Sequence, residues 1–430
     1  MKSKDDGVEL VAIGTLRLGM FVELDVGWLA HPFPTGSFKL SSARQIETIR
    51  GLGLQHVRVN TAKSDPEPSD ASPPSNISFD VQAAARNEAA LREALLRRQR
   101  SEDLTAQQRS LVACERRFGE VVRQYRKALE LIPSQPKVAT AQCQAMVDGF
   151  VGEMLSEGEC AIRLLSEAAG DKSSMHPVNV TIVSLLLGKA MGLDKTELSD
   201  LGLAAFLHDV GKAQLPDRVR WLEENFSTAE YKLYQEHVAY SVQVGKSMEL
   251  PKAALMAIAQ HHELADGSGF PSRAKGEAMT RCARILALVN RYDNLCNPSR
   301  PAMALTPHES LSMIFAQQKT RFDTAALSAF IRMMGVYPPG SVVQLVDERY
   351  AMVVSVNSAR PLKPRVLVHD AGVPRHEALI LDLEQAPHVG IRRSLKPAAL
   401  PVAALDFLAP RQRVTYFFER VVDSQIGALA

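Results

Sequence analysis

Residues 207–212 read LHDVGK, and residues 260–271 read QHHELADGSGFP. Each stretch ends an apolar helical run with two adjacent side chains that can bind metal: His208 with Asp209, and His261 with His262. Neighbouring side chains on a helix point about 100° apart, so both can face one site only near a helix end or a kink. A glycine follows the first pair and a turn-rich segment follows the second, as is typical of helix ends. The two pairs are therefore predicted to converge on a metal cluster.

The donor types narrow the choice of metal. Imidazoles combined with a carboxylate favour Fe, Mn or Zn, and the absence of thiolates in the motifs argues against a structural zinc site. Fe or Mn is preferred over Zn in this interpretation. A single histidine is more often a packed or surface residue than a ligand, so the prediction depends on the whole group of motifs.

The HDVGK and HHELADGSGFP motifs resemble those of the HD-GYP family, a branch of the HD superfamily of metal-dependent phosphohydrolases. Members of this family typically hydrolyse the bacterial second messenger cyclic di-GMP. The resemblance covers roughly residues 161–340, and Phe270 stands where the family has a tyrosine. It implies an all-α catalytic bundle that holds two divalent metal ions.

The resemblance also implies roles for individual residues. Asp209 would bridge the two metals, and Asn290 occupies the position of a second metal-binding aspartate. The implied histidine ligands are His176 and His208 on one metal, and His237, His261 and His262 on the other. The implied substrate-binding residues are Lys212, Gly267, Gly269, Phe270, Pro271 and, with a one-residue offset from the family motif, Arg300. Lys212 is assigned a catalytic contact to the phosphate, although on sequence alone it equally fits a lysine that interacts with a helix C-terminus.

Three positions depart from the family pattern. Asn290 offers a carbonyl oxygen without a negative charge, so its metal would bind less tightly. Asp293, on the same helical face, is the alternative ligand, and Asn290 is favoured as a weak one. Lys172 replaces a glutamate found in members with three metals, so two metals are expected. Phe270 lacks the phenolic hydroxyl but keeps a ring for packing or stacking.

These features predict a cyclic di-GMP phosphodiesterase, in which a water acidified by the metals attacks phosphorus and the metals stabilise the developing charge. The expected product is linear pGpG, with GMP as a further product. Two alternatives stay open. One is a catalytically degenerate module that binds cyclic di-GMP or a protein partner, such as a diguanylate cyclase, as a regulator. The other is an enzyme that acts on another phosphoester.

Composition limits the partners and the location. A chain of 430 residues is long enough for two or three modules with at least one large core. A formal charge of +2 and a pI near 8.2 give no reason to expect a nucleic acid polymer or a membrane surface as partner. Five cysteines without CxxC spacing, and an N-terminus without a secretory signal, predict reduced thiols and a cytoplasmic protein. No window approaches the roughly 18 apolar residues of a membrane span.

The first part of the chain divides by composition. Residues 8–60 predict a small α+β module, with a helix capped by Ser41 or Ser42, and resemble the uncharacterised domain that precedes some HD-GYP domains. In this module Trp28, His31 and Phe33 are interpreted as core residues in preference to a ligand surface. Residues 61–80, rich in Ser, Pro and Asp, predict a disordered linker.

The rest of the chain is predicted to be helical and then to form strands. Residues 81–132 predict a long helix or coiled-coil segment whose apolar seam either packs on its own domain or forms a homodimer. Residues 138–340 are assigned as the catalytic domain, helical throughout to about Met334, and residues 341–430 as a β extension and tail. The predicted fold class is mainly α: an all-α HD-type helical bundle with a small N-terminal α+β module and a short C-terminal β extension.

Overall fold

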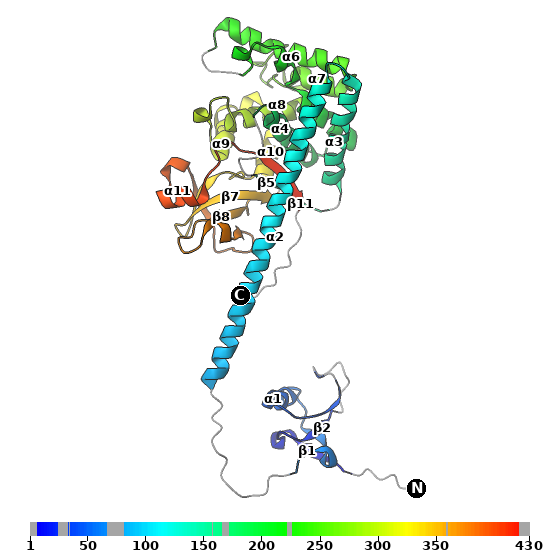
Figure 1. The fold of residues 1–430 in the computed structure, drawn as a ribbon, viewed down its shortest axis with the longest axis vertical. Coiled ribbons are helices and arrows are strands. Elements are labelled where there is room, and N and C mark those ends of the chain that lie inside the picture. Colours follow the sequence, from blue (N-terminus) through cyan, green and yellow to red (C-terminus); the bar gives the residue numbers. More distant parts are fainter. Residues whose placement is uncertain are drawn as a thin grey trace, which may run out of the picture. The chain divides into compact units, whose positions relative to one another are not determined.

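The computed structural model describes residues 7–24, 33, 35–66, 81–156, 158–165, 172–221, 226–357 and 360–420. Trp28 and His31 lie outside these residues, as do residues 67–80 of the predicted linker and the side chain of Lys172. Contacts divide the chain into two compact units, Met1–Glu88 and Ala89–Ala430, which are described separately (Figure 1).

The N-terminal unit is a four-stranded antiparallel sheet with one helix. Its elements are β1 (Val8–Ala12), β2 (Phe21–Glu23), β3 (Ser37–Lys39), α1 (Ala43–Gly51) and β4 (His56–Asn60). The strands lie in the order β1-β4-β2-β3. Ser42 caps α1 through a capping box with Gln45, so the predicted cap is confirmed. Phe33 packs against the core of this unit and lies 4.5 Å from the ring of Phe38, in line with its interpretation as a core residue.

The predicted long helix is present as a single element, α2 (Val81–Leu131). It ends just before Pro133, and α3 (Pro136–Leu155) begins at a proline, which fits the first position of a helix. Phe118, Val122 and Tyr125 on α2 are buried in the core of the second unit. This stretch of the seam therefore packs on its own domain, and the homodimer stays a prediction.

The helices of the second unit surround α4 (Lys172–Ala190), which is buried on all sides from Ser174 to Gly188. A helix that is buried on every face is a core helix, although α4 also carries buried polar residues such as His176 and Asn179. Three neighbouring helices begin with capping boxes, in which a Ser, Thr or Asp side chain pairs with a glutamate three residues on. The remaining helices are α5 (Lys195–Leu207), α6 (Thr228–Ser247), α7 (Lys252–Gln260), α8 (Arg281–Cys296), α9 (Pro307–Gln317), α10 (Thr324–Met334) and α11 (Val402–Leu408).

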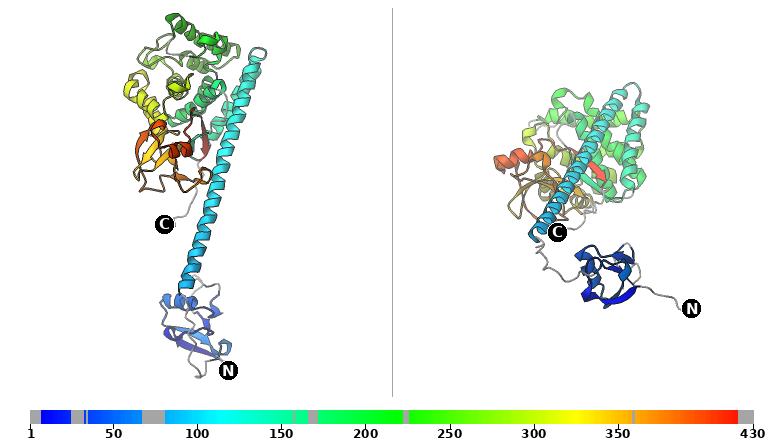
Figure 2. Two further views of the ribbon diagram at one scale, coloured as in Figure 1. Left: turned by 60° about the vertical axis from the view of Figure 1, so that its left-hand side comes forward. Right: turned by 60° about the horizontal axis from the view of Figure 1, so that its bottom comes forward.

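An antiparallel sheet packs below this bundle (Figures 1 and 2), and its strands come from chain segments both before and after the bundle helices. Its strands are β5 (Cys160–Leu164), β6 (Val342–Leu345), β7 (Tyr350–Asn357), β8 (Arg365–Val368), β9 (Ile380–Asp382), β10 (Ile391–Leu395) and β11 (Tyr416–Arg420). The main path runs β10-β6-β7-β5-β11, and β8 joins β7 to β9. The strands predicted after residue 340 are present, and β11 comes from the tail to which no structure was assigned.

The prediction that residues 138–340 are helical throughout is wrong at β5. Gly158 has a φ of +114°, a conformation that favours glycine, and the chain leaves the helical path there. All five residues of Cys160–Leu164 are buried, so the strand shows no alternation of apolar and polar side chains. A short buried run of this kind, apolar except for Arg163, cannot be distinguished from a buried helix by periodicity.

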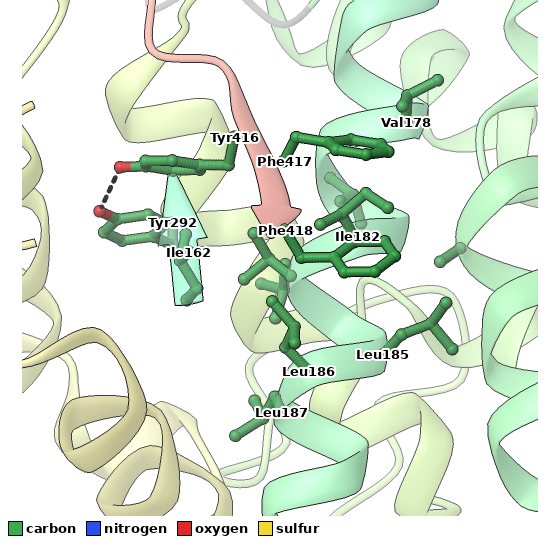
Figure 3. Close-up of a cluster of buried hydrophobic side chains, with 14 of the residues drawn as sticks. Ile162, Val178, Ile182, Leu185, Leu186, Leu187, Tyr292, Tyr416, Phe417 and Phe418 are labelled. Atoms are coloured by element: carbon green, nitrogen blue, oxygen red, sulfur yellow. Dashed lines mark hydrogen bonds between the residues drawn. The ribbon is translucent and has the colours of Figure 1, made fainter. Parts of the chain in front are cut away.

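The sheet and the bundle share one hydrophobic core (Figure 3). Phe417 and Phe418 on β11 lie against the face of α4 that carries Val178 and Ile182. At the edge of this cluster the hydroxyl groups of Tyr292 and Tyr416 are 3.0 Å apart and share a hydrogen bond. The C-terminal strand is therefore part of the core that supports the helices.

The predicted fold class is confirmed: the second unit is mainly helical, with an α+β module before it and strands after the bundle. Within the described part of the chain, no helix combines the length and apolar character needed to cross a membrane.

Candidate metal centre

The two motif pairs lie at helix ends, as their adjacency predicts. Helix α5 ends at Leu207, His208 follows with helical angles, and Asp209 starts the short 3-10 helix η4 (Val210–Gln214) with φ −103° and ψ 5°. Helix α7 ends at Gln260, directly before the His261 and His262 pair. These changes of direction let neighbouring side chains face one site.

Gly211 holds the first turn against α6. A Cβ at this position would lie 2.3 Å from the backbone nitrogen of Ser241 and 2.4 Å from the carbonyl oxygen of His237. The Gly211 N–H also donates a hydrogen bond of 2.9 Å to the Ser241 hydroxyl. The absence of a side chain therefore sets the distance between Asp209 and the histidine that α6 carries.

The predicted ligands form two groups that share one carboxylate. One group is Asp209, His237, His261 and His262, and the other is His176, His208 and Asp209, with the ligand atoms of each group within 4.8 Å of one another. The Asp209 Oδ2 lies 3.4 Å from the Nε2 of His208 and 3.6 Å from that of His176. The Asp209 Oδ1 lies 3.5 Å from the Nε2 of His237 and 3.7 Å from that of His261. Each oxygen of Asp209 therefore faces a different set of imidazoles.

The backbone fixes which imidazole nitrogen is available. Three histidines place Nδ1 against the carbonyl oxygen three residues earlier: His208 on Ala205 at 2.8 Å, His261 on Ile258 at 2.6 Å, and His237 on Tyr234. A carbonyl only accepts, so Nδ1 must carry the proton, and Nε2 of a neutral ring keeps its lone pair. This outer hydrogen bond is the usual companion of a metal-binding histidine.

Burial keeps the imidazoles of His208, His237 and His262 neutral. It lowers the pKa of His208 and His262 well below the usual imidazole range and brings the pKa of His237 to about 3. The Nε2 atoms of neighbouring rings then face one another at 3.3 Å (His176 and His208), 3.3 Å (His237 and His261) and 3.1 Å (His237 and His262).

These spacings suit a shared cation better than hydrogen bonds between lone pairs. Two nitrogens bound about 2.1 Å from one metal, at an angle of roughly 90–110°, are about 3.0–3.4 Å apart. The Asp209 Oδ1 is buried and has no hydrogen-bond partner among the residues that the structure describes. An unpaired buried carboxylate oxygen among neutral imidazoles fits divalent metal ions, as the sequence predicts.

Lys212 places a positive charge beside the Asp209 carboxylate. Its Nζ lies 2.6 Å from the Asp209 Oδ2, and it also lies over the rings of Trp221 and Tyr234 at 5.5 and 5.4 Å. Burial alone would raise the pKa of Asp209, but Lys212 and the histidines hold it well below its usual range. Burial would likewise lower the pKa of Lys212, and its contacts with Asp209 and Tyr234 raise it instead. The carboxylate is therefore charged and the ammonium protonated.

Helix α8 supplies Asn290 and Asp293, which have different surroundings. Asn290 is buried, and its Oδ1 accepts a 2.7 Å hydrogen bond from the Asn294 amide. The Asp293 carboxylate lies 2.6 Å from the Nδ1 of His176 and also accepts from Asn179. Asp293 thus contacts the side of His176 opposite to Asp209. This contact orients the ring and does not place Asp293 where Asn290 would bind a metal.

The loop after the second histidine pair packs directly on it. The Phe270 ring stacks on His262 with centroids 4.5 Å apart and planes 20° from parallel. A Cβ on Gly269 would lie 2.5 Å from the His262 carbonyl oxygen, while Gly267 and Pro271 shape the turn on either side. Glu263 is fully buried and accepts hydrogen bonds from the backbone of Ser272 and Ala274.

Two residues that support the site were not predicted from the sequence, and one predicted residue lies on a different element. The role of Glu263 in holding residues 272–274 was not predicted, although a glutamate directly after a histidine pair is a signal for such a contact. Tyr234, which contacts both Lys212 and His237, was also missed. Arg300 is exposed at the start of the 3-10 helix Pro301–Met303, and its role in binding substrate stays a prediction.

Comparisons with known proteins define the class. Residues 161–326 match the family model described as HD domain, and residues 10–143 match the domain of unknown function DUF3391. The chain is therefore an HD-domain protein with a DUF3391 domain ahead of the catalytic region, and the resemblance to the HD-GYP family is confirmed.

Individual relatives match the chain over different lengths. The chain is 26% identical over 362 residues to the cyclic di-GMP phosphodiesterase PA4108 of Pseudomonas aeruginosa, covering 83% of this chain and 84% of that protein. It is 30% identical over 152 residues to the cyclic di-GMP phosphodiesterase response regulator RpfG of Xanthomonas campestris pv. campestris, covering 35% and 40%. Among solved structures, the HDG"Y"P protein Bd1817 of Bdellovibrio bacteriovorus matches with a TM-score of 0.41 and 14% identity, covering 75% of this chain and 98% of that chain.

Proposed function

We propose that this chain is a metal-dependent phosphodiesterase that hydrolyses cyclic di-GMP to linear pGpG. The observation that carries the proposal is the position of Asp209, whose two oxygens face separate histidine groups and whose Oδ1 finds no hydrogen-bond partner in the described ranges. A carboxylate in this position can bridge two divalent ions. The relatives that bear the name cyclic di-GMP phosphodiesterase support the choice of substrate.

The first ion would be held by His176, His208 and Asp209, and the second by Asp209, His237, His261 and His262. Divalent ions in such a site supply a water of lowered pKa and neutralise charge on phosphate oxygens. The neutral imidazoles and the buried carboxylate form a rigid set of donors, because the backbone or Asp293 orients four of the five rings. Asn290, buried on α8, is the residue that would add a neutral oxygen ligand to this set.

The Lys212 ammonium contributes a fixed positive charge at the edge of the centre. It lies within hydrogen-bond distance of Asp209 and is held between the rings of Trp221 and Tyr234. A phosphodiester that approaches Asp209 therefore meets a cation that can contact a non-bridging oxygen. Phe270, stacked on His262, offers an apolar surface next to the same position.

The reaction adds water across one 3′–5′ phosphodiester. The water oxygen bonds to phosphorus, the bond from phosphorus to the 3′ oxygen breaks, and that oxygen leaves with a proton as the 3′ hydroxyl. One hydrolysis opens the ring to linear pGpG. A second hydrolysis at the same site would give GMP, and is part of the proposal only as a slower step.

One observation favours a second candidate, a module that binds cyclic di-GMP without turnover. The Asn290 oxygen already accepts a hydrogen bond from Asn294, and an amide carries no charge to hold a metal. Weak binding of one ion would leave nucleotide recognition intact while slowing hydrolysis. In that case the chain acts as a regulator, with a diguanylate cyclase as one kind of partner.

The test is hydrolysis of cyclic di-GMP by anaerobically prepared protein loaded with Mn or Fe, measured beside metal content. Asn290→Asp restores the charge, and Asp209→Asn serves as the matched control because it keeps the shape of the side chain. Turnover by the parent that is lost in Asp209→Asn supports the enzyme. Cyclic di-GMP binding without turnover in the parent, together with turnover in Asn290→Asp, would show that the chain is the binding module.

A further inference from the structure

A second cavity lies between α2 and the C-terminal sheet, and it shares no residue with the metal centre. Its volume is about 840 Å³, within the range of roughly 300–1,000 Å³ that small-molecule sites occupy. The walls carry five arginines against four acidic side chains, which leaves a small positive excess.

The floor of the cavity is a row of polar residues on adjacent strands. Arg163 on β5 pairs in register with Ser355 on β7, Ser355 with Arg365 on β8, and Arg365 with Asp382 on β9. All four line the cavity. Residues paired across strands lie side by side on one face of a sheet, so two guanidinium groups flank one hydroxyl. The Arg365 Nε donates to the Asp382 carboxylate at 3.1 Å, which leaves its two Nη groups for a ligand.

Two atoms of this row are buried without a partner. The Arg163 side chain donates from Nη1 to both oxygens of Glu419, at 2.9 and 3.1 Å, but within the described part of the chain its Nε has no hydrogen-bond partner. Within the same residues the Ser355 hydroxyl also has none, and this residue is only 2% exposed. Buried donors without acceptors reduce stability, so the floor is suited to a ligand that brings acceptor oxygens.

The side of the cavity that α2 forms is polar. Gln107 donates from Nε2 to the Ala378 carbonyl at 3.2 Å and accepts from the Ile380 N–H at 2.9 Å. Ser110 donates to Glu419 at 2.6 Å. Further along the same helix, Phe118 and Val122 pack tightly into the core. Because α2 meets the sheet here through hydrogen bonds and not through close apolar packing, a space stays open between them. Apolar residues such as Val368 also line this space.

We infer that this cavity binds a phosphorylated small molecule of about nucleotide size, with its phosphate on Arg163, Ser355 and Arg365. Arginine donates in a planar fork that matches phosphate oxygens, and a serine hydroxyl can donate to a third. The ligand would contact both α2 and the strands beneath it. It would therefore stabilise the position of residues 100–110 of α2, which pack on the sheet through polar contacts. The site is independent of the proposed hydrolysis.

Titration calorimetry on the full-length, chelator-treated protein tests the inference, because chelation removes binding at the metal centre. The probes are GMP, a sugar phosphate, inorganic phosphate and, as the uncharged control, guanosine. At least one phosphate ester should bind in a saturable way and more tightly than guanosine. Hydrogen exchange should slow in residues 100–110 when that ligand is present.

Three variants localise the binding. Ser355→Ala and Arg365→Gln should each weaken it about tenfold, the effect of losing one hydrogen bond to a charged group. Ala106→Trp fills the cavity from an exposed position on α2 and should abolish it. Ala94→Trp, also exposed on α2 but outside the cavity, is the matched control and should bind as the parent does. No saturable binding of any phosphate ester, guanosine binding equal to GMP, or full binding by Ala106→Trp would overturn the inference.

Discussion

Replacing Gly211 with alanine should disable the metal centre without touching a ligand. The new Cβ would lie 2.3–2.4 Å from backbone atoms of Ser241 and His237, whereas ordinary contact begins at 3.4 Å, so α6 would have to retreat by about 1 Å. Overpacking of this kind costs about 1–3 kcal/mol of stability. A displacement of about 1 Å at a reacting centre costs on the order of a hundredfold in rate. We therefore expect turnover to fall about a hundredfold and the Mn content to fall with it.

Two measurements separate this effect from simple unfolding. Circular dichroism at the assay temperature should show that Gly211→Ala is still folded, and Mn content per chain should be reduced in the folded protein. The matched control is Gly149→Ala, because Gly149 is exposed in α3 and a Cβ there meets nothing within 4 Å. Alanine in that helix should add about 0.5–1 kcal/mol of stability and leave turnover unchanged. Parent-like metal content and turnover in Gly211→Ala would refute the idea that close packing on α6 sets the ligand spacing.

Three further outcomes are expected. Phe417→Ala should lower the free energy of unfolding by about 3–5 kcal/mol, because Phe417 is fully buried beside Phe118 and Phe150; Phe315→Ala, at a 57% exposed site, should change it by less than about 0.5 kcal/mol in the same urea titration. Mn at about a hundredfold its dissociation constant should raise the stability of the parent by about 2.7 kcal/mol in a thermal melt, and an equal rise in Asp209→Asn would argue against Asp209 as a ligand. Burial raises the pKa of the Cys114 thiol to about 11 and that of Cys143 to about 12, so neither forms thiolate near neutral pH. A colorimetric thiol reagent should find no fast-reacting cysteine in the native protein and five after unfolding, and rapid labelling of the native chain would show that these sites open.

The sequence was sufficient to predict the centre of the site because its information is local. Two adjacent pairs at helix ends constrain their own geometry, and the structure brings the paired residues together with His176 and His237. The contacts behind the ligands could not be predicted in the same way. Asp293 was considered as a replacement ligand, and only the packing of α8 against α4 shows that it faces the Nδ1 of His176. Side-chain direction across two packed helices is not contained in the spacing of either one.

The strands show the same limit on a larger scale. The strands β6, β7 and β8 are separated by turn or proline segments and were predicted, whereas β5 lies within a helical region and is buried on both faces. Its partner β11 is about 250 residues away in the chain, and the register between them, Cys160 to Arg420 through Leu164 to Tyr416, depends on contacts that no local window contains. Non-local pairing of short strands is therefore the part of this fold that a single sequence leaves undetermined.

The position of β11 also determines what can be cut out of this protein. The HD family match ends at residue 326, yet Phe417 and Phe418 fill the core against α4, and Phe118 of α2 packs on the edge of the Phe417 ring at 6.2 Å. A fragment bounded by the family match would lose the closing strand and the supporting helix, and would leave both edges of β5 unpaired, because its partners β7 and β11 lie beyond residue 326. A fragment that keeps the metal centre together with its supporting core thus runs from within α2 to the end of β11, and is nearly twice as long as the family match.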